Sequence, residues 1–284
     1  MVRGVVSRAV DVRHLGRDRV ICAFEVDGLV VDPGPASSVE TLLAEVPEPR
    51  GLLLTHIHLD HAGAAGVLVR RFPSMPVYVH ERGAPHVVDP SRLLASATRL
   101  YGEDNMARLW GEVAPVPEAN VHVLAGGEQV EGFRVAYTPG HASHHVCYLH
   151  EASGRAYVGD MAGVRIPPSD FTMPPTPPPD IDLEAWGASL DTIAGWSPAA
   201  LCLTHFGEVG EVEHQLAVVR ERLKSWGERA RALDQRAFCE HVTAEIGAAT
   251  DPATAASYTQ AAPPEQLWLG LERYWRKRAE REAA

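Results

Sequence analysis

Four side chains with metal-binding chemistry lie within six consecutive positions, inside the sequence Thr-His-Ile-His-Leu-Asp-His-Ala-Gly at 55–63. Histidines two residues apart in extended backbone point to the same side, so His56 and His58 can bind one metal ion together. Asp60 and His61 follow where the chain turns, and they can face a second ion. Imidazole and carboxylate suit borderline divalent metals such as zinc. The alternative is a His-rich polar loop without metal, and four potential ligands at chelating spacing weigh against it.

Two predicted elements position this motif. The short, bounded aliphatic run Gly51–Leu54 predicts a buried strand, and the Ala-, Val- and Leu-rich segment Ala62–Phe72 predicts a helix. The motif therefore lies at a strand-to-helix turn on the rim of a sheet. Continued alternation of strand and helix patterns indicates a βαβ arrangement with helices covering the sheet. Further strands are predicted at 2–10, 20–26, 29–32, 77–80, 121–124, 133–138, 146–150, 156–160 and 199–204, and further helices at 38–46, 182–194, 211–248 and 263–282.

The pattern His-x-His-x-Asp-His after an apolar strand resembles the signature of the metallo-β-lactamase superfamily, and its form here is similar to that of the glyoxalase II-like hydrolases. The resemblance extends over about residues 3–210, with the motif segments in the expected order. It implies an α/β fold, a four-layer αβ/βα metallo-β-lactamase sandwich, here with a C-terminal helical extension. It also implies a full set of metal ligands. That set is His56, His58 and His141 for one ion, Asp60, His61 and His205 for the other, and Asp160 as the bridge.

Each ligand that the resemblance adds follows a predicted strand. His141 comes after Thr-Pro-Gly, Asp160 after Val-Gly and His205 after Leu-Thr. The alternatives are a loop His exposed to solvent and an Asp that only forms a turn. The places of these residues in the motif order favour the ligand roles.

Other polar residues near these motifs receive supporting or ordinary roles. By resemblance, Asp32 supports the metal-binding loop from behind, although a turn-forming Asp before Pro is an equal alternative. His145 falls where the family often has a structural His, and His144 stands where Gly is common. His80 and His86 have no second ligand at chelating spacing, so we expect no metal role for them.

Two segments near the predicted site have open roles. Residues 90–113 predict amphipathic helices that form a packing layer or, less favoured, border the substrate pocket. The Pro-rich stretch 167–180 excludes a helix and a central strand. We interpret it as a stiff loop past the metal site, with Phe171 and Met173 as substrate contacts, in preference to a polyproline II linker.

Length and composition limit the domain organisation, the partners and the cellular location of the protein. The chain has 284 residues, 45% of them hydrophobic, and a formal net charge of −11. We predict a catalytic domain at 1–210 and a helical region at 211–284 that contributes to substrate binding or to a homo-oligomer. An acidic chain without a basic stripe makes nucleic acid an unfavoured partner. The lack of a long apolar run predicts no signal peptide and no membrane partner, and the scattered cysteines predict buried free thiols in the cytoplasm.

Our functional prediction is a binuclear metal-dependent hydrolase that acts on an acyl ester bond of a small molecule, such as a thioester or lactone. Two divalent ions, zinc in preference to iron or manganese, would share a hydroxide that attacks the carbonyl, and Asp60 would relay the proton. By resemblance, the alternatives are a mononuclear iron persulfide dioxygenase, with iron on His56, His141 and Asp160, and a metal-dependent phosphodiesterase. A metal-free binding protein would need a degenerate site, and no ligand position is missing. Glutathione is not predicted, because the glutathione-binding residues of glyoxalase II have no recognisable match here.

Overall fold

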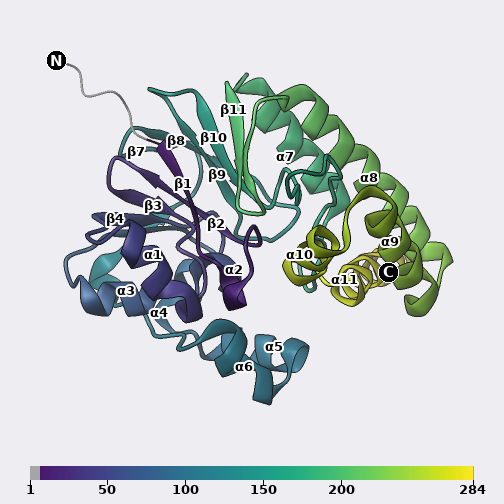
Figure 1. The fold of residues 1–284 in the computed structure, drawn as a ribbon, viewed down its shortest axis with the longest axis horizontal. Helices are drawn as coiled ribbons and strands as arrows, with labels where there is room; N and C mark the ends of the chain where they lie inside the picture. Colours follow the sequence, from purple (N-terminus) through teal and green to yellow (C-terminus); the bar gives the residue numbers. More distant parts are fainter. Residues whose placement is uncertain (1–6, 284) are drawn as a thin grey trace.

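The computed structural model describes residues 7–283 and arranges them in four layers, with two β-sheets packed face to face between two layers of helices (Figure 1). Both sheets are mixed, and together they confirm the predicted αβ/βα sandwich. The first sheet contains, in spatial order, β1 (Ser7–Asp11), β2 (Cys22–Val26), β3 (Leu29–Val31), β4 (Gly51–Leu53), β5 (Val77–His80) and β6 (Val121–Leu124). The second contains β12 (Gly207–Val209), β11 (Ala200–Leu203), β10 (Arg155–Gly159), β9 (Val146–His150), β8 (Phe133–Tyr137) and β7 (Gln129–Val130).

Helices cover the outer face of each sheet. The first sheet packs against α1 (Val39–Glu45), α3 (Ala65–Arg71) and α4 (Ala84–Val88), and the second against α7 (Leu183–Gly195) and α8 (Val212–Ala232). The remaining helices are α2 (Leu59–Ala62), α5 (Ser91–Tyr101), α6 (Glu103–Trp110), α9 (Gln235–Ala249), α10 (Pro252–Ala261) and α11 (Pro264–Glu282). Among residues 7–283, no helix combines the length and the hydropathy that a membrane crossing needs.

Alternating side chains along the strands separate three apolar cores. In β2, Phe24 packs between the two sheets, whereas Ala23 packs against the helices of the first sheet. In β9, Tyr148 lies between the sheets and Cys147 faces the helices of the second sheet. This period of two is what a strand buried on both faces requires. Cys22, Cys147 and Cys202 are buried free thiols, as predicted, and Cys239 is partly exposed.

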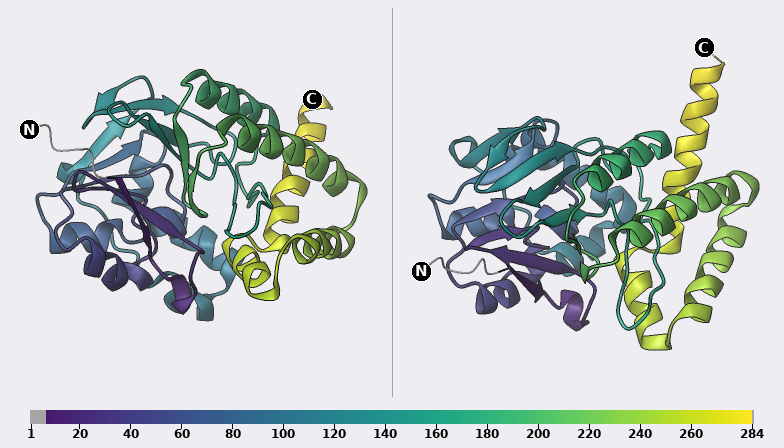
Figure 2. Two further views of the ribbon diagram at one scale, coloured as in Figure 1. Left: turned by 45° about the horizontal axis from the view of Figure 1, so that its top comes forward. Right: turned by 90° about the horizontal axis from the view of Figure 1, so that it is seen from above.

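The C-terminal helices α8–α11 lie on the side of the molecule away from α1 and α3 (Figure 2). Buried residues of these helices, such as Val219 and Leu271, belong to the same apolar core as Val158 and Leu201 of the second sheet. The last part of the chain is therefore packed onto the sandwich. The domain boundary at residue 210 stays a prediction.

The predicted elements differ from the structure mainly at the bounds of helices and strands and at very short strands. The strand predicted at 2–10 is described only from Ser7, and residues 2–6 lie outside the described range. The helix predicted at 62–72 begins at Ala65 and ends at Arg71, and Ala62 belongs instead to the preceding short helix α2. Three-residue β12 and two-residue β7 had no recognisable pattern, since their pairing with β11 and β8 is tertiary.

Candidate metal centre

The predicted ligands lie at one edge of the sandwich, where strands of both sheets end. The loop after β4 and helix α2 carry four of them, and the loops after β8, β10 and β11 carry one each. The structure brings them into two groups, within each of which the possible ligand atoms lie within 4.8 Å of one another. The first group is His56, His58, His141 and Asp160, and the second is Asp60, His61 and His205.

Three ring nitrogens converge in the first group. His58 Nδ1 lies 2.9 Å from His56 Nε2 and 3.0 Å from His141 Nε2. His141 Nδ1 donates to the carbonyl oxygen of Pro175 at 2.9 Å, and His56 Nδ1 lies 3.1 Å from the hydroxyl of Thr55. These outer bonds place the proton on Nδ1, so the Nε2 lone pairs of His56 and His141 face the centre of the group, as metal ligation requires.

The second group is held in the same way. His205 Nδ1 donates to the carbonyl oxygen of Val20 at 2.6 Å, and its Nε2 lies 3.3 Å from Asp60 Oδ2. His61 Nδ1 lies 2.7 Å from Asp32 Oδ2, and its Nε2 lies 3.7 Å from Asp60 Oδ2. Both rings are thus oriented by a partner on the side opposite the group.

Asp160 faces both groups. Its Oδ1 lies 3.3 Å from His61 Nε2, and its Oδ2 lies 3.2 Å from His141 Nε2. Burial alone would raise the pKa of this carboxyl, but the neighbouring His61, His141 and His205 lower it well below its usual range. A buried, ionised carboxylate between the two groups is placed to bridge two cations.

The charge balance of the site fits divalent cations. Burial and the neighbouring His141 lower the pKa of His58 to about 4, so this ring is neutral at physiological pH. Burial alone would lower the pKa of His61, but Asp160, Asp60 and Asp32 raise it well above its usual range. Buried carboxylates here therefore demand positive charge nearby. Neutral imidazoles and carboxylates form the donor set of zinc-type ions, so the two groups are consistent with a binuclear metal site.

Asp32 ties the ligand-bearing loops together. Its Oδ1 accepts the backbone N–H of Thr55 at 2.8 Å, and its Oδ2 accepts from the hydroxyls of Thr55 at 2.7 Å and Thr204 at 2.9 Å. The same Oδ2 contacts His61. One fully buried carboxylate thus links the end of β3 to the loops after β4 and β11. The geometry matches the supporting role predicted for Asp32.

The backbone before Asp160 packs against the ligand loops so closely that only glycine fits. Gly159 has a φ of 49°, in the left-handed region. A Cβ at this position would lie 2.5 Å from Thr55 Oγ1 and 2.7 Å from His145 Nε2. The absence of a side chain at Gly159 therefore lets Asp160 approach the loop after β4.

Four histidines that the sequence left open belong to neither group. His145 is fully buried beside His56, with ring centroids 4.9 Å apart, which fits the structural role predicted for it. His80 stacks on Tyr137, as an ordinary residue. His144 and His86 line the cavity above the site.

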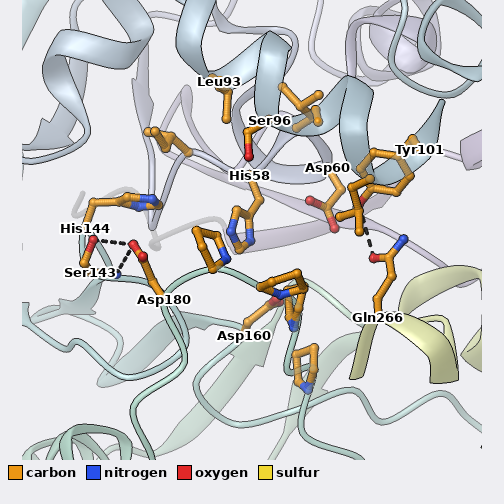
Figure 3. A pocket seen from close by; sticks show the side chains of 18 of the residues that line it. His58, Asp60, Leu93, Ser96, Tyr101, Ser143, His144, Asp160, Asp180 and Gln266 are labelled. Carbon is orange, nitrogen blue, oxygen red and sulfur yellow. Dashed lines mark hydrogen bonds between the residues drawn. The ribbon is translucent and has the colours of Figure 1, made fainter. Parts of the chain in front are cut away.

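A cavity of about 530 Å³ opens over the site, with His58, Asp60 and Asp160 among its lining residues (Figure 3). Helix α5 forms one wall through residues that include Leu93, Ser96 and Tyr101. The loop at 175–180 and the start of α11 form the facing walls. Tyr101 on α5 donates its hydroxyl proton to Oε1 of Gln266 on α11 at 3.4 Å.

One expectation about this cavity was wrong, and one was incomplete. Phe171 and Met173 are not substrate contacts but are buried in the core of the second sheet, where Phe171 packs edge-on against Tyr258. The pairing of Met173 with Val164 turns both side chains inward, and the prolines that follow line the cavity instead. The segment 90–113 forms an apolar packing cluster around Ala97 and Trp110, as favoured, and its helix α5 also supplies a cavity wall.

Sequence reasoning missed several contributors to the site. The carbonyl groups of Val20 and Pro175 orient two candidate ligands, and a backbone carbonyl has no side-chain signature. Tyr101 stands four positions after Ala97 on the apolar face of α5, so helical spacing gave a usable signal for it. Gln266 had no such signal.

Residues 25–205 match the model of the metallo-β-lactamase superfamily. This match spans more than half of the chain and includes all of the predicted ligands, and the chain belongs to this superfamily.

The chain is also similar to characterised and solved members. It is 33% identical over 122 residues to hydroxyacylglutathione hydrolases of Salmonella paratyphi B and Salmonella newport, a match that covers 43% of this chain and 38% of each relative's length. A metallo-β-lactamase family protein of Thermus thermophilus superposes with a TM-score of 0.65 at 21% identity, over 97% of this chain and 94% of that one. A superfamily protein of the archaeon Sulfolobus tokodaii superposes with a TM-score of 0.64 at 24% identity, over 80% of this chain and 87% of that one. At these identities the two solved structures establish the fold alone.

Proposed function

We propose that this protein is a binuclear metal-dependent hydrolase whose substrate carries an acyl ester bond, such as a thioester or a lactone. The observation that carries the proposal is the position of Asp160, which faces both His/Asp groups beside a cavity of about 530 Å³. The partial similarity to hydroxyacylglutathione hydrolases supports an acyl ester in preference to a phosphodiester.

The chain's own residues prepare the site for this chemistry. Two divalent ions bound there would supply Lewis acidity and a water that is acidic near neutral pH. Outer hydrogen bonds fix the rings of His141 and His205, so little side-chain entropy is lost when they bind. Asp60 belongs to the second group and also lines the cavity, with 19% of its side chain exposed. Its carboxylate is therefore placed to accept a proton beside the reacting carbonyl.

The test combines metal analysis with a substrate panel. Elemental analysis of protein purified without added metal should find about two divalent ions per chain, and a thioester and lactone panel should reveal hydrolysis. His56→Ala should lower both metal content and rate. Unchanged metal content and rate in His56→Ala would contradict the assignment of the metal site. A single iron per chain, with oxygen uptake on glutathione persulfide, would replace the hydrolase with a persulfide dioxygenase.

A further inference from the structure

Three arginines line the cavity. Arg82 lies in the loop after β5, and Arg92 and Arg99 lie on α5, seven residues apart and therefore on the same face of the helix. All three are exposed, which places them at the mouth of the cavity. We call these residues the arginine rim.

None of the three guanidinium groups has a carboxylate within 4.0 Å among the residues that the structure describes. Some arginines elsewhere on the surface are paired, since Arg70 contacts Glu112 and Arg155 contacts Glu208, both at 2.6 Å. Two acidic residues near the rim have partners of their own. Asp89, before α5, accepts the backbone N–H of Ser91, and Asp180 accepts the hydroxyl proton of Ser143 inside the cavity. The rim is therefore available to an external anion.

The rim places three positive charges at the cavity opening of an acidic molecule. The formal net charge of the chain is −11, so an anionic substrate gains nothing from the protein as a whole. Three guanidinium groups at one opening, none with a carboxylate partner among the described residues, attract such a substrate to the cavity that contains Asp60 and Asp160. Guanidinium also matches phosphate in geometry, because it presents pairs of parallel N–H donors.

Two walls of the cavity beneath the rim carry apolar side chains. Leu93, Ala97 and Leu100 line one wall, and Pro177 and Pro178 line another. A ligand that fits this arrangement has an apolar part inside and a strongly anionic part at the mouth.

On this basis, and resting on the proposed function, we propose that the substrate is an acyl thioester whose thiol carries phosphate groups, the chemistry of coenzyme A, and that the arginine rim binds those phosphates. Hydrolysis consumes one water, breaks the carbon–sulfur bond and releases a carboxylic acid and the phosphate-bearing thiol. A glutathione thioester fits less well, because its two carboxylates are offset by an ammonium group and leave the three guanidinium groups mostly unmatched.

Binding is tested first, without turnover, by calorimetry on the metal-loaded protein with S-ethyl coenzyme A, a thioether that cannot be hydrolysed. The double variant Arg92→Glu/Arg99→Glu should bind it at least about tenfold more weakly. The matched double variant Arg229→Glu/Arg236→Glu changes the same charge on α8 and α9, outside the cavity, and should bind within about twofold of the native protein. Equal binding by the two double variants, or no binding by the native protein, would overturn the proposal.

Turnover is tested second, with one acyl group on three thiols: coenzyme A, glutathione and the uncharged N-acetylcysteamine. The native protein should prefer the coenzyme A thioester in kcat/KM. Arg92→Glu/Arg99→Glu should lose at least about tenfold more on this thioester than on the uncharged one. A preference for the glutathione thioester would overturn the phosphate assignment. Binding of S-ethyl coenzyme A without hydrolysis of any thioester would support the rim and contradict the proposed hydrolase.

Discussion

Asp32 Oδ2 lies 2.7 Å from Nδ1 of His61, and both side chains are completely buried. This contact fixes the ring of a candidate ligand from the side opposite the metal group. The same carboxylate holds the loops that carry Thr55 and Thr204. Its removal should therefore disturb the metal centre although Asp32 belongs to neither ligand group.

Asp32→Asn should lower metal affinity by about 10- to 100-fold. The amide NH₂ would then face groups that donate hydrogen bonds to the carboxylate in the native protein. Competition with a chelator, followed by elemental analysis, measures this loss. Asp27→Asn in the exposed turn between β2 and β3 is the matched control and should keep native affinity. Native metal affinity in Asp32→Asn would show that this contact does not support the ligands.

Variants of Asp160 and of His205 should lose different amounts of metal. Asp160→Asn should reduce the content of both sites, because Asp160 faces both groups. His205→Ala should retain about one ion per chain, since the first group stays complete. Metal content per chain after dialysis distinguishes the two. The bridging role would be rejected if Asp160→Asn kept both ions.

Removal of metal should destabilise the fold. Without cations, the buried carboxylates and imidazoles of the two groups lose their counter-charge, and ligand linkage predicts a loss of at least about 2–3 kcal/mol in the free energy of unfolding. Urea denaturation with and without chelator measures the difference. Coincident unfolding curves would mean that metal does not bind the native state selectively.

His144→Ala should raise KM without lowering metal content. His144 lines the cavity and is 9% exposed, but it lies outside both ligand groups. Loss of one hydrogen-bonding ring costs about 1 kcal/mol of substrate binding, or roughly fivefold in KM. Kinetics on the preferred substrate test this, with exposed His214→Ala on α8 as the control. A variant that loses metal instead would place His144 among the ligands.

Helix α11 packs directly on the Pro-rich loop at Gly270. A Cβ there would lie 2.0 Å from the carbonyl oxygen of Thr176, whose hydroxyl donates to the carbonyl oxygen of Leu267 of α11 at 3.0 Å. Gly270→Ala should destabilise the protein by about 1–3 kcal/mol through overpacking. Gly247 lies at an exposed position of α9, and among the described residues a Cβ added there would meet no packed neighbour within 4 Å. Gly247→Ala should therefore stabilise the protein by about 0.5–1 kcal/mol. Denaturant unfolding should give opposite signs, and equal shifts would contradict the packing argument.

The sequence by itself determined the local elements and the type of chemistry. Short β-rich runs predicted β5 and β6 with the bounds that the structure has. The continuous apolar pattern of β5 reflects burial on both faces, whereas β6 is an edge strand in which Val123 is exposed. The spacing of His56 and His58 indicated shared ligation, since the side-chain direction in extended backbone depends only on position along the chain. The motif order supplied His141, Asp160 and His205 through resemblance, and the structure places them beside the first motif.

Only the tertiary structure decided which groups surround the ligands and what shape the substrate meets. Val20 and Pro175 act through backbone carbonyls, which every residue possesses. Tyr101 and Gln266 meet across the cavity although they are 165 positions apart in the chain. Phe171 was misplaced because hydrophobicity predicts burial but does not say against which surface. Such contacts depend on how the layers pack together, and no local pattern encodes that arrangement.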